Sequence, residues 1–286
     1  MKKGAVIVLS ITTLLLVAAG ILFGAVFCLR YQSVKVVGDS PITISKEDII
    51  STAGLKEGQS IFLLDKEKAI NNIEAKFPFI KVIQVKTTGL TEIEFIVRAR
   101  HKMFYSETAS KYYIMDEELK VLDILEKSAE SSSDEVSKLI LINSNNFSID
   151  SSTLVCDFVG TDEQREATYN LYQAMINAVT KNDVEDIAYI NRDDVKNEIR
   201  QIEFKSHSTF NTIIITTKYG VKLDIENPQN DMANKINICY IAISQYLSSE
   251  EAIEQSKVTK GTIKIYLDLE NKQNIIYIPE IETELE

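Results

Sequence analysis

Apolar and polar positions divide the chain into one long apolar run followed by short strand-like and helix-like segments. The run covers residues 4–29 and contains no charged side chain. As a helix it would be roughly 39 Å long, more than the ~30 Å hydrocarbon core of a bilayer. It is longer than the apolar part of a cleaved signal peptide, and Phe27 stands where cleavage requires a small residue. We therefore predict an uncleaved transmembrane helix over residues 4–29.

Charge predicts the orientation of this helix and the partners that the rest of the chain avoids. Lys2 and Lys3 favour a cytoplasmic tail of residues 1–3, with the bulk of the chain outside the cytoplasm. Residues 1–30 carry three positive and no negative side chains, so the net charge of −11 leaves −14 on residues 31–286. Such an acidic region repels nucleic acid and anionic headgroups. We expect no nucleic-acid partner, and a contact with the lipid bilayer through residues 4–29.

After the apolar run, the periodicity changes to that of a strand, two helices and two further strands. Val34 and Val36 alternate with polar neighbours, as in a short strand. Ser45 and Asp65 are typical N-cap residues of helices. The strands are expected at residues 34–37, 79–86 and 92–97, and the helices are expected to end at Gly54 and Pro78.

The length and pattern of residues 101–278 predict a second, larger unit with an extended sheet and two main helices. A hairpin is expected over residues 112–125, and a helix begins at Thr161 because Gln164 completes a capping box. Residues 126–137 are polar and rich in serine, which indicates an exposed loop. Further strands are expected near residues 187–190, 199–204, 212–217, 221–225 and 261–269, with a helix over residues 231–247.

Several of these segments carry a resemblance to a known family. The sequence VKVVGD, the connection from Gly58 to Phe62 and the Pro78-x-Ile80 entry into paired strands resemble a polypeptide-transport-associated (POTRA) domain. This is the form that follows the membrane helix in the bacterial cell-division family FtsQ, called DivIB in Gram-positive bacteria. The later segments TTKYGVKLDI and MANKI are similar to the second domain of that family. The chain departs from the family at Ala99, where an acid commonly precedes the arginine, and at Leu119, where a glycine is usual.

The resemblance and the periodicity together give the expected fold class, α+β. They predict a single N-terminal transmembrane helix, a βααββ POTRA domain over residues 31–100 and a larger mixed α/β domain over residues 101–278. Residues 279–286 are expected to form a flexible acidic tail. The resemblance implies a single-pass type II protein of the bacterial cell membrane, found at the division septum.

No catalytic constellation is visible in the sequence. His101 and His207 are the only histidines, and neither lies in a recognisable motif. Ser-x-x-Lys, a phosphate-binding loop, His-Glu-x-x-His and Gly-x-Ser-x-Gly are all missing from the sequence. Cys28, Cys156 and Cys239 lack the close spacing of a metal or redox site. We expect no enzymatic activity, no cofactor and no metal site. The sequence leaves two alternatives for the cysteines: buried free thiols, or a disulfide between Cys156 and Cys239.

A non-enzymatic scaffold of the division machinery is the function that these observations favour. An alternating strand at a sheet edge can bind a partner by strand addition. The resemblance implies that the C-terminal strands, residues 261–269 and 275–278, bind FtsB (DivIC)-like and FtsL-like single-pass division proteins. An aromatic residue is a typical anchor, so Tyr266 is the preferred contact. The predicted partner-binding residues are Ile263, Lys264, Ile265, Tyr266, Leu267 and Tyr277.

The POTRA domain is implied to contact other membrane division proteins, and the outer edges of residues 34–37 or 92–97 are the candidates. Three alternatives remain. Both C-terminal strands could lie inside the sheet, with Tyr266 as a packing residue. The chain could be a POTRA-type accessory protein in secretion or assembly, or an extracytoplasmic sensor of a small ligand. Neighbouring genes would distinguish these functions: division genes favour the scaffold, a barrel or translocator gene favours the accessory protein, and a regulator gene favours the sensor.

Overall fold

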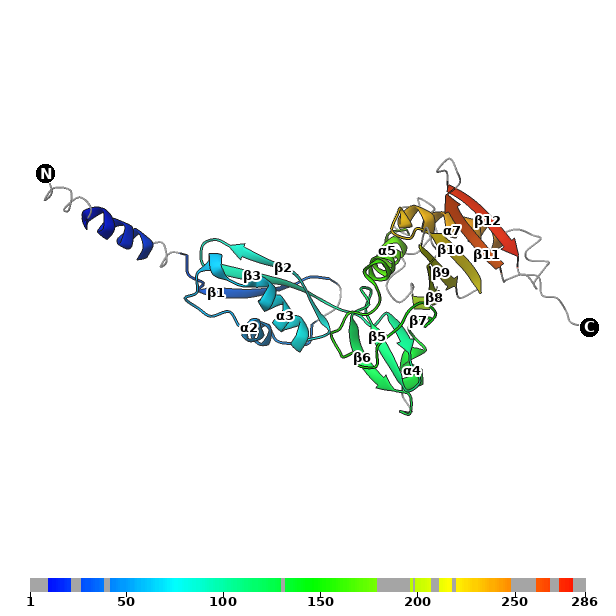
Figure 1. Ribbon diagram of the computed structural model, residues 1–286, viewed down its shortest axis with the longest axis horizontal. Helices are drawn as coiled ribbons and strands as arrows, with labels where there is room; N and C mark the ends of the chain where they lie inside the picture. Colours follow the sequence, from blue (N-terminus) through cyan, green and yellow to red (C-terminus); the bar gives the residue numbers. More distant parts are fainter. Residues whose placement is uncertain are drawn as a thin grey trace, which may run out of the picture. The chain divides into compact units, whose positions relative to one another are not determined.

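The computed structural model describes residues 10–21, 27–38, 42–129, 132–178, 196–197, 199–206, 211–217, 220–247, 261–267 and 273–279. The chain divides into two compact units, Met1–Arg100 and His101–Glu286 (Figure 1). The strand predicted near residues 187–190 and residues 280–286 of the predicted tail lie outside the described residues.

Residues 10–21 form a helix, while residues 4–9 and 22–26 of the predicted transmembrane helix lie outside the described part. Within that part, none of the helices combines the length and the hydropathy needed to cross a bilayer. Leu29, the last residue of the predicted helix, is fully buried in the core of the first unit. A membrane span would therefore have to end before Leu29.

The first unit has the element order βααββ, with one short 3-10 turn between the helices. Its three-stranded sheet has the order β1-β3-β2, in which β1 pairs with β3 in parallel and β2 pairs with β3 antiparallel. The elements are β1 (Tyr31–Val36), α2 (Lys46–Ala53), η1 (Ile61–Leu63), α3 (Lys66–Lys76), β2 (Ile80–Thr88) and β3 (Glu92–Ala99). Both helices and all three strands contribute side chains to one core.

Local capping explains where the two helices of the first unit begin and end. The Ser45 hydroxyl accepts a hydrogen bond from the Asp48 N–H at 3.1 Å, and Asp65 Oδ1 accepts one from the Lys68 N–H at 2.9 Å. Gly54 ends α2 with φ +71°, a left-handed conformation that glycine adopts without steric cost. These predicted caps are confirmed.

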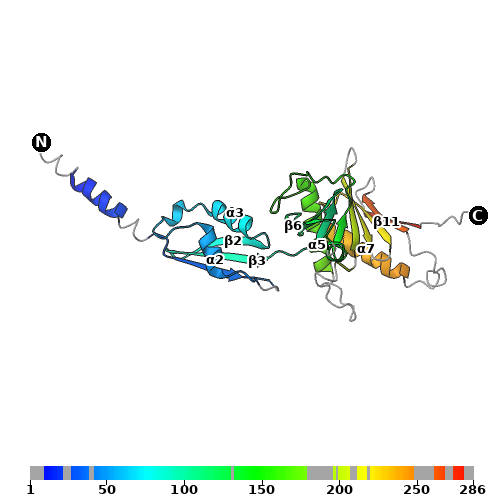
Figure 2. The same ribbon diagram turned by 90° about the horizontal axis from the view of Figure 1, so that it is seen from below.

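The second unit is built on a nine-stranded sheet of order β12-β11-β10-β9-β8-β7-β4-β5-β6. Two long helices, α5 (Asp162–Ala178) and α7 (Met232–Leu247), contact each other and contribute to its core (Figures 1 and 2). The strands are β4 (Phe104–Glu107), β5 (Lys111–Met115), β6 (Val121–Glu126), β7 (Ile140–Ile142), β8 (Ile199–Ser206), β9 (Asn211–Thr217), β10 (Val221–Glu226), β11 (Gly261–Leu267) and β12 (Gln273–Pro279).

The predicted capping box at the start of α5 is confirmed. The Thr161 N–H donates to Gln164 Oε1 at 2.9 Å, and the Gln164 N–H donates to Thr161 Oγ1 at 3.3 Å. The exposed loop predicted over residues 126–137 is wrong in part, because the short helix α4 (Ser132–Val136) forms there. Val136 and Ser132 are buried, and Ser132 Oγ donates to the Glu126 carbonyl at 2.8 Å. Tertiary burial has overridden the polar composition.

The hairpin of β5 and β6 turns through residues 116–120, and Leu119 adopts φ +58° there. Leu119 is also fully buried. A non-glycine residue in this region costs roughly 1–2 kcal/mol. The departure from the family's glycine therefore keeps the turn geometry and adds an apolar side chain to the core.

All three cysteines are free thiols in the structure, so Cys156 and Cys239 are not paired. Cys239 lies on α7 in the core of the second unit, where burial raises the pKa of its thiol to about 12.

On the same helix, Lys235 donates to the carbonyls of Glu226 and Asn227 at 2.8 and 2.9 Å. Its ammonium group ties α7 to the end of β10.

Candidate partner-binding surfaces

Five of the six predicted partner-binding residues lie on β11, which is an inner strand of the sheet. β11 pairs in parallel with β10 on one side and antiparallel with β12 on the other. From Gly261 to Ile265 its backbone hydrogen-bonding groups are therefore engaged on both sides and cannot accept a further strand, whereas Tyr266 and Leu267 pair with β12 alone. Residues 261–265 are therefore not a free edge, residues 268–269 lie outside the described residues, and partner binding by this strand stays a prediction.

The sixth predicted residue, Tyr277, lies on β12 opposite Ile263 in the register. β12 is the terminal strand of the sheet order. Its sequence, QNIIYIP, contains no charged residue. A long, uncharged, apolar edge strand is a template for pairing with another chain, and soluble proteins usually avoid leaving one uncovered. β12 is thus the strand best suited to strand addition.

The opposite edge strand of the same sheet, β6, is partly covered by another segment of the chain. The Val121 N–H donates to the Asp157 carbonyl at 2.8 Å, and the Cys156 N–H donates to the Val121 carbonyl at 2.8 Å. The Val159 N–H donates to the Leu119 carbonyl at 3.0 Å just before the strand begins. Residues 156–159 therefore cover the beginning of this edge with backbone hydrogen bonds.

Of the two candidate edges of the first unit, residues 34–37 lie largely on an outer strand, β1, as expected, and residues 92–97 do not. β3, predicted as a possible outer edge, is the central strand and pairs with both β1 and β2. The outer strands are β1 and β2. β2 carries a bulge at Ile83, because its neighbours Val82 and Gln84 pair with consecutive residues of β3. Bulges disturb the regular ladder that a partner strand would need, so β2 is partly protected. Sequence alternation could not identify β2 as an edge, because alternation reports burial and not neighbours.

A buried ion pair lies where the first unit ends. Arg100 Nη2 lies 2.9 Å from Glu74 Oε2, and both side chains are largely buried. Arg100 Nε also donates to the Ile80 carbonyl at 3.3 Å, and the Val82 N–H donates to Glu74 Oε1 at 2.9 Å. Glu74, on α3, thus supplies an acid for this arginine, although the preceding residue is alanine.

A second charged cluster lies at the start of the second unit. Lys102 Nζ contacts Asp123 of β6 at 2.8 Å and also contacts Glu135 of α4. Partial burial alone would lower the pKa of Lys102, but hydrogen bonds to these two carboxylates raise it overall. The cluster joins β6 to α4, and we interpret it as structural.

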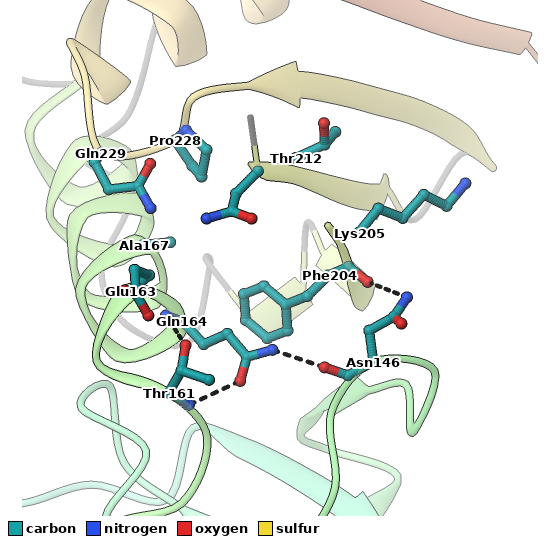
Figure 3. A pocket seen from close by; sticks show the side chains of 11 residues that line it. Asn146, Thr161, Glu163, Gln164, Ala167, Phe204, Lys205, Thr212, Pro228 and Gln229 are labelled. Atoms are coloured by element: carbon teal, nitrogen blue, oxygen red, sulfur yellow. Dashed lines mark hydrogen bonds between the residues drawn. The ribbon is translucent and has the colours of Figure 1, made fainter. Parts of the chain in front are cut away.

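A half-open pocket of about 370 Å³ lies at the amino end of α5, beside β8 and β9 (Figure 3). Its floor is a chain of hydrogen bonds among its own residues. Gln164 Nε2 donates to the Asn146 carbonyl at 2.7 Å, and Asn146 Nδ2 donates to the Phe204 carbonyl at 3.1 Å. These amides hold α5 to the end of β8, so this side of the pocket is a structural junction. The buried hydroxyl of Thr212, in the same lining, has no hydrogen-bond partner among the described residues.

The chemistry available in this pocket is limited. Glu163 is the carboxylate at its wall, and hydrogen bonds from its own backbone N–H and from the Thr161 hydroxyl lower its pKa. A carboxylate shifted in this direction is a poorer general base. Across the described residues, no group of three or more His, Cys, Asp or Glu could hold a metal ion.

The fold and these surfaces define a class: a POTRA-type βααββ unit followed by a larger α/β unit whose sheet ends in an uncharged strand. Comparison with known proteins shows which family part of the chain is similar to. Residues 29–94 match the family model described as "POTRA domain, FtsQ-type". The matched segment begins at Leu29, the residue that the structure buries in the first unit.

Relatives named "Cell division protein DivIB" are also similar to the chain. The protein from Clostridium acetobutylicum is 32% identical over 100 residues, which cover 34% of this chain and 40% of that protein. Those from the Hall and Loch Maree strains of Clostridium botulinum are 24% and 25% identical over 162 residues, 57% of each chain. The matches thus span about 40 to 57% of the length of these relatives.

Together these matches confirm the resemblance to the FtsQ/DivIB family that the sequence predicts. The chain carries an FtsQ-type POTRA domain and is related to cell-division proteins. The sequence prediction placed five of its six binding residues on β11 and one, Tyr277, on β12, the terminal strand. Composition distinguishes this strand: Gln273–Pro279 is a β-rich stretch without a single charge.

Proposed function

We propose that this chain is a non-enzymatic, membrane-anchored scaffold of the bacterial division machinery. In this function it links other single-pass division proteins, of the FtsB/DivIC and FtsL kinds, at the septum. The POTRA domain would contact further membrane division proteins, and the uncharged run from residue 4, ending before Leu29, would supply the anchor. The bulk of the chain would lie outside the cytoplasm.

One observation carries the binding part of this proposal: β12 is an uncharged terminal strand of a nine-stranded sheet. Strand addition to such an edge provides affinity through backbone hydrogen bonds and selectivity through alternate side chains. The similarity to proteins named for cell division supports the cellular setting. The predicted residues on β11 would then act mainly by holding β12 in register.

A pair of neighbouring proline variants on β12 tests strand addition. Successive residues of an antiparallel strand direct their N–H groups to opposite sides. Of Ile276→Pro and Tyr277→Pro, one therefore removes a bond to β11 and the other removes a donor at the outer edge. We expect one variant to lose thermal stability, and the other to keep its melt but no longer co-purify with the DivIC-like protein.

The proposal would be contradicted if every proline variant that folds well still bound the DivIC-like protein. Tyr266→Glu provides a second test of the predicted site. It should weaken co-purification while leaving the circular-dichroism melt nearly unchanged. Unfolding of Tyr266→Glu would instead identify Tyr266 as a core residue. In dividing cells, a fluorescent fusion should form a midcell band, and uniform membrane fluorescence would count against the division function.

A further inference from the structure

The end of the POTRA domain at which the chain enters is held together by backbone hydrogen bonds between three segments. The Leu29 N–H donates to the Gln59 carbonyl at 2.8 Å, and the Gly58 N–H donates to the Leu29 carbonyl at 2.9 Å. On the other side, the Arg30 N–H donates to the Thr91 carbonyl at 2.8 Å. Residues 27–31, residues 58–63 and the turn between β2 and β3 therefore form one tip of the domain (Figure 1).

Large apolar side chains project from all three segments of this tip. Phe62 is 64% exposed and Leu63 is 85% exposed, both on η1. Tyr31, at the start of β1, is 66% exposed, and Leu90, in the β2–β3 turn, is 53% exposed. The Phe62 ring lies 5.2 Å from the ring of Phe27, measured between centroids. The apolar surface therefore continues directly into the last residues of the uncharged run.

Exposed side chains of this size on one tip call for an apolar cover. The covalent order of the chain indicates which cover is available. The tip begins at residue 27, and the 26 residues from Gly4 to Leu29 carry no charge. Hydrogen bonds at residues 27–30 make the end of that run part of the domain. A bilayer that holds the run would thus meet the tip first.

We infer that the tip, formed by Phe27, Tyr31, Phe62, Leu63 and Leu90, inserts into the interfacial layer of the same bilayer and fixes the POTRA domain end-on to the membrane. Aromatic side chains favour this layer, where the ring is in an apolar setting and the polar end stays hydrated. Arg30, Lys56 and Glu57 at or beside the tip are exposed and sum to a single positive charge, so the contact does not require anionic lipid. The inference rests on the membrane anchoring in the proposed function.

The chain contains no tryptophan, which permits a direct test with single-tryptophan variants of the full chain. Phe62→Trp and Leu63→Trp place a reporter on the tip. Phe79→Trp is the matched control, because Phe79 is also a partly exposed aromatic residue, with 41% of its surface exposed. It precedes β2, whereas the tip residue Leu90 follows β2, so the two lie at opposite ends of this strand. The nine residues of β2 separate these two ends by roughly 30 Å.

The variants are reconstituted into vesicles of phosphatidylcholine, with or without bromine on the acyl chains. We expect the chain to float with the vesicles, and we expect both tip reporters to show blue-shifted emission and loss of intensity with brominated lipid. The Phe79→Trp emission should stay unchanged. Vesicles containing phosphatidylglycerol should give the same quenching.

Other outcomes overturn the inference in distinguishable ways. If the chain floats but neither tip reporter is quenched, the tip contact is refuted while the anchor stands. Equal quenching of Phe79→Trp would refute the end-on arrangement. If the chain does not float, both the anchor and the tip contact fail, and the proline variants of β12 still decide the partner-binding proposal. Circular-dichroism melts of the three variants show that each reporter sits on a folded domain.

Discussion

Replacing Arg100 with alanine tests whether the POTRA domain depends on one buried ion pair. The Arg100 side chain is 2% exposed and the Glu74 side chain is 14% exposed. The guanidinium contacts Glu74 Oε2 at 2.9 Å and the Ile80 carbonyl at 3.3 Å. Because Glu74 lies on α3 and Ile80 begins β2, the pair joins a helix to the sheet.

Removing the arginine takes away the cationic partner that lies 2.9 Å from the largely buried Glu74 carboxylate. Loss of one partner of a buried pair costs about 3–5 kcal/mol, because the remaining charge stays desolvated. Glu74 keeps the hydrogen bond from the Val82 N–H and a little solvent contact. We therefore expect the lower end, about 3 kcal/mol, which is a large part of the ~5–15 kcal/mol that stabilises a typical domain.

The measurement is urea unfolding of the full chain, followed by hydrogen exchange in peptides from residues 66–100. Local exchange is needed because two units need not unfold in one step. Adding Glu74→Gln to Arg100→Ala should restore stability relative to the sum of the single changes, by ~1–3 kcal/mol of coupling. Lys35→Ala, at an exposed position of β1, should change stability by less than ~0.5 kcal/mol. A cost below ~1 kcal/mol for Arg100→Ala, or strict additivity, would refute the reasoning.

Two further predictions concern the second unit. Leu119 combines full burial with φ +58°, so Leu119→Gly relieves backbone strain that Leu119→Ala keeps, and the glycine variant should be more stable by ~1 kcal/mol. Urea midpoints compare the two, and an alanine variant as stable as the glycine variant would contradict this. Burial raises the pKa of the Cys239 thiol from 9.0 to about 12, so its contribution to stability is complete below pH 9 and is lost as the pH rises towards 12. Between pH 9 and 11 the native chain should lose more stability than Cys239→Ala, and equal slopes in the two chains would argue against a raised pKa.

The parts of the fold that the sequence predicts well are those decided within a few residues. The caps at Ser45, Asp65 and Thr161 each accept from a backbone N–H three residues away. A side chain of the right type at the right spacing is enough to make such a bond. The FtsQ-type match also covers the unit whose βααββ order was predicted from local alternation.

The strand order of the second unit depends on contacts that no short window contains. β7 has three residues, too few to show alternation, yet it joins β4 to β8 and so connects the two halves of the sheet. β4 was missed for the same reason, since it has only four residues. The inner position of β11 follows from β10 on one side and β12 on the other. Alternation in β11 could not distinguish an inner strand from an edge strand.

The contrast between the two edges of this sheet changes the meaning of the predicted site. The beginning of β6 is covered by residues 156–159, as expected for an edge that must not recruit another strand. β12 has no charge along its length, and within the described part of the chain its only strand partner is β11. Because uncharged edges that stay uncovered promote aggregation, this asymmetry favours a partner strand beside β12. Tyr266, opposite Asn274 in the register, would then affect binding by positioning β12 and not as the primary contact.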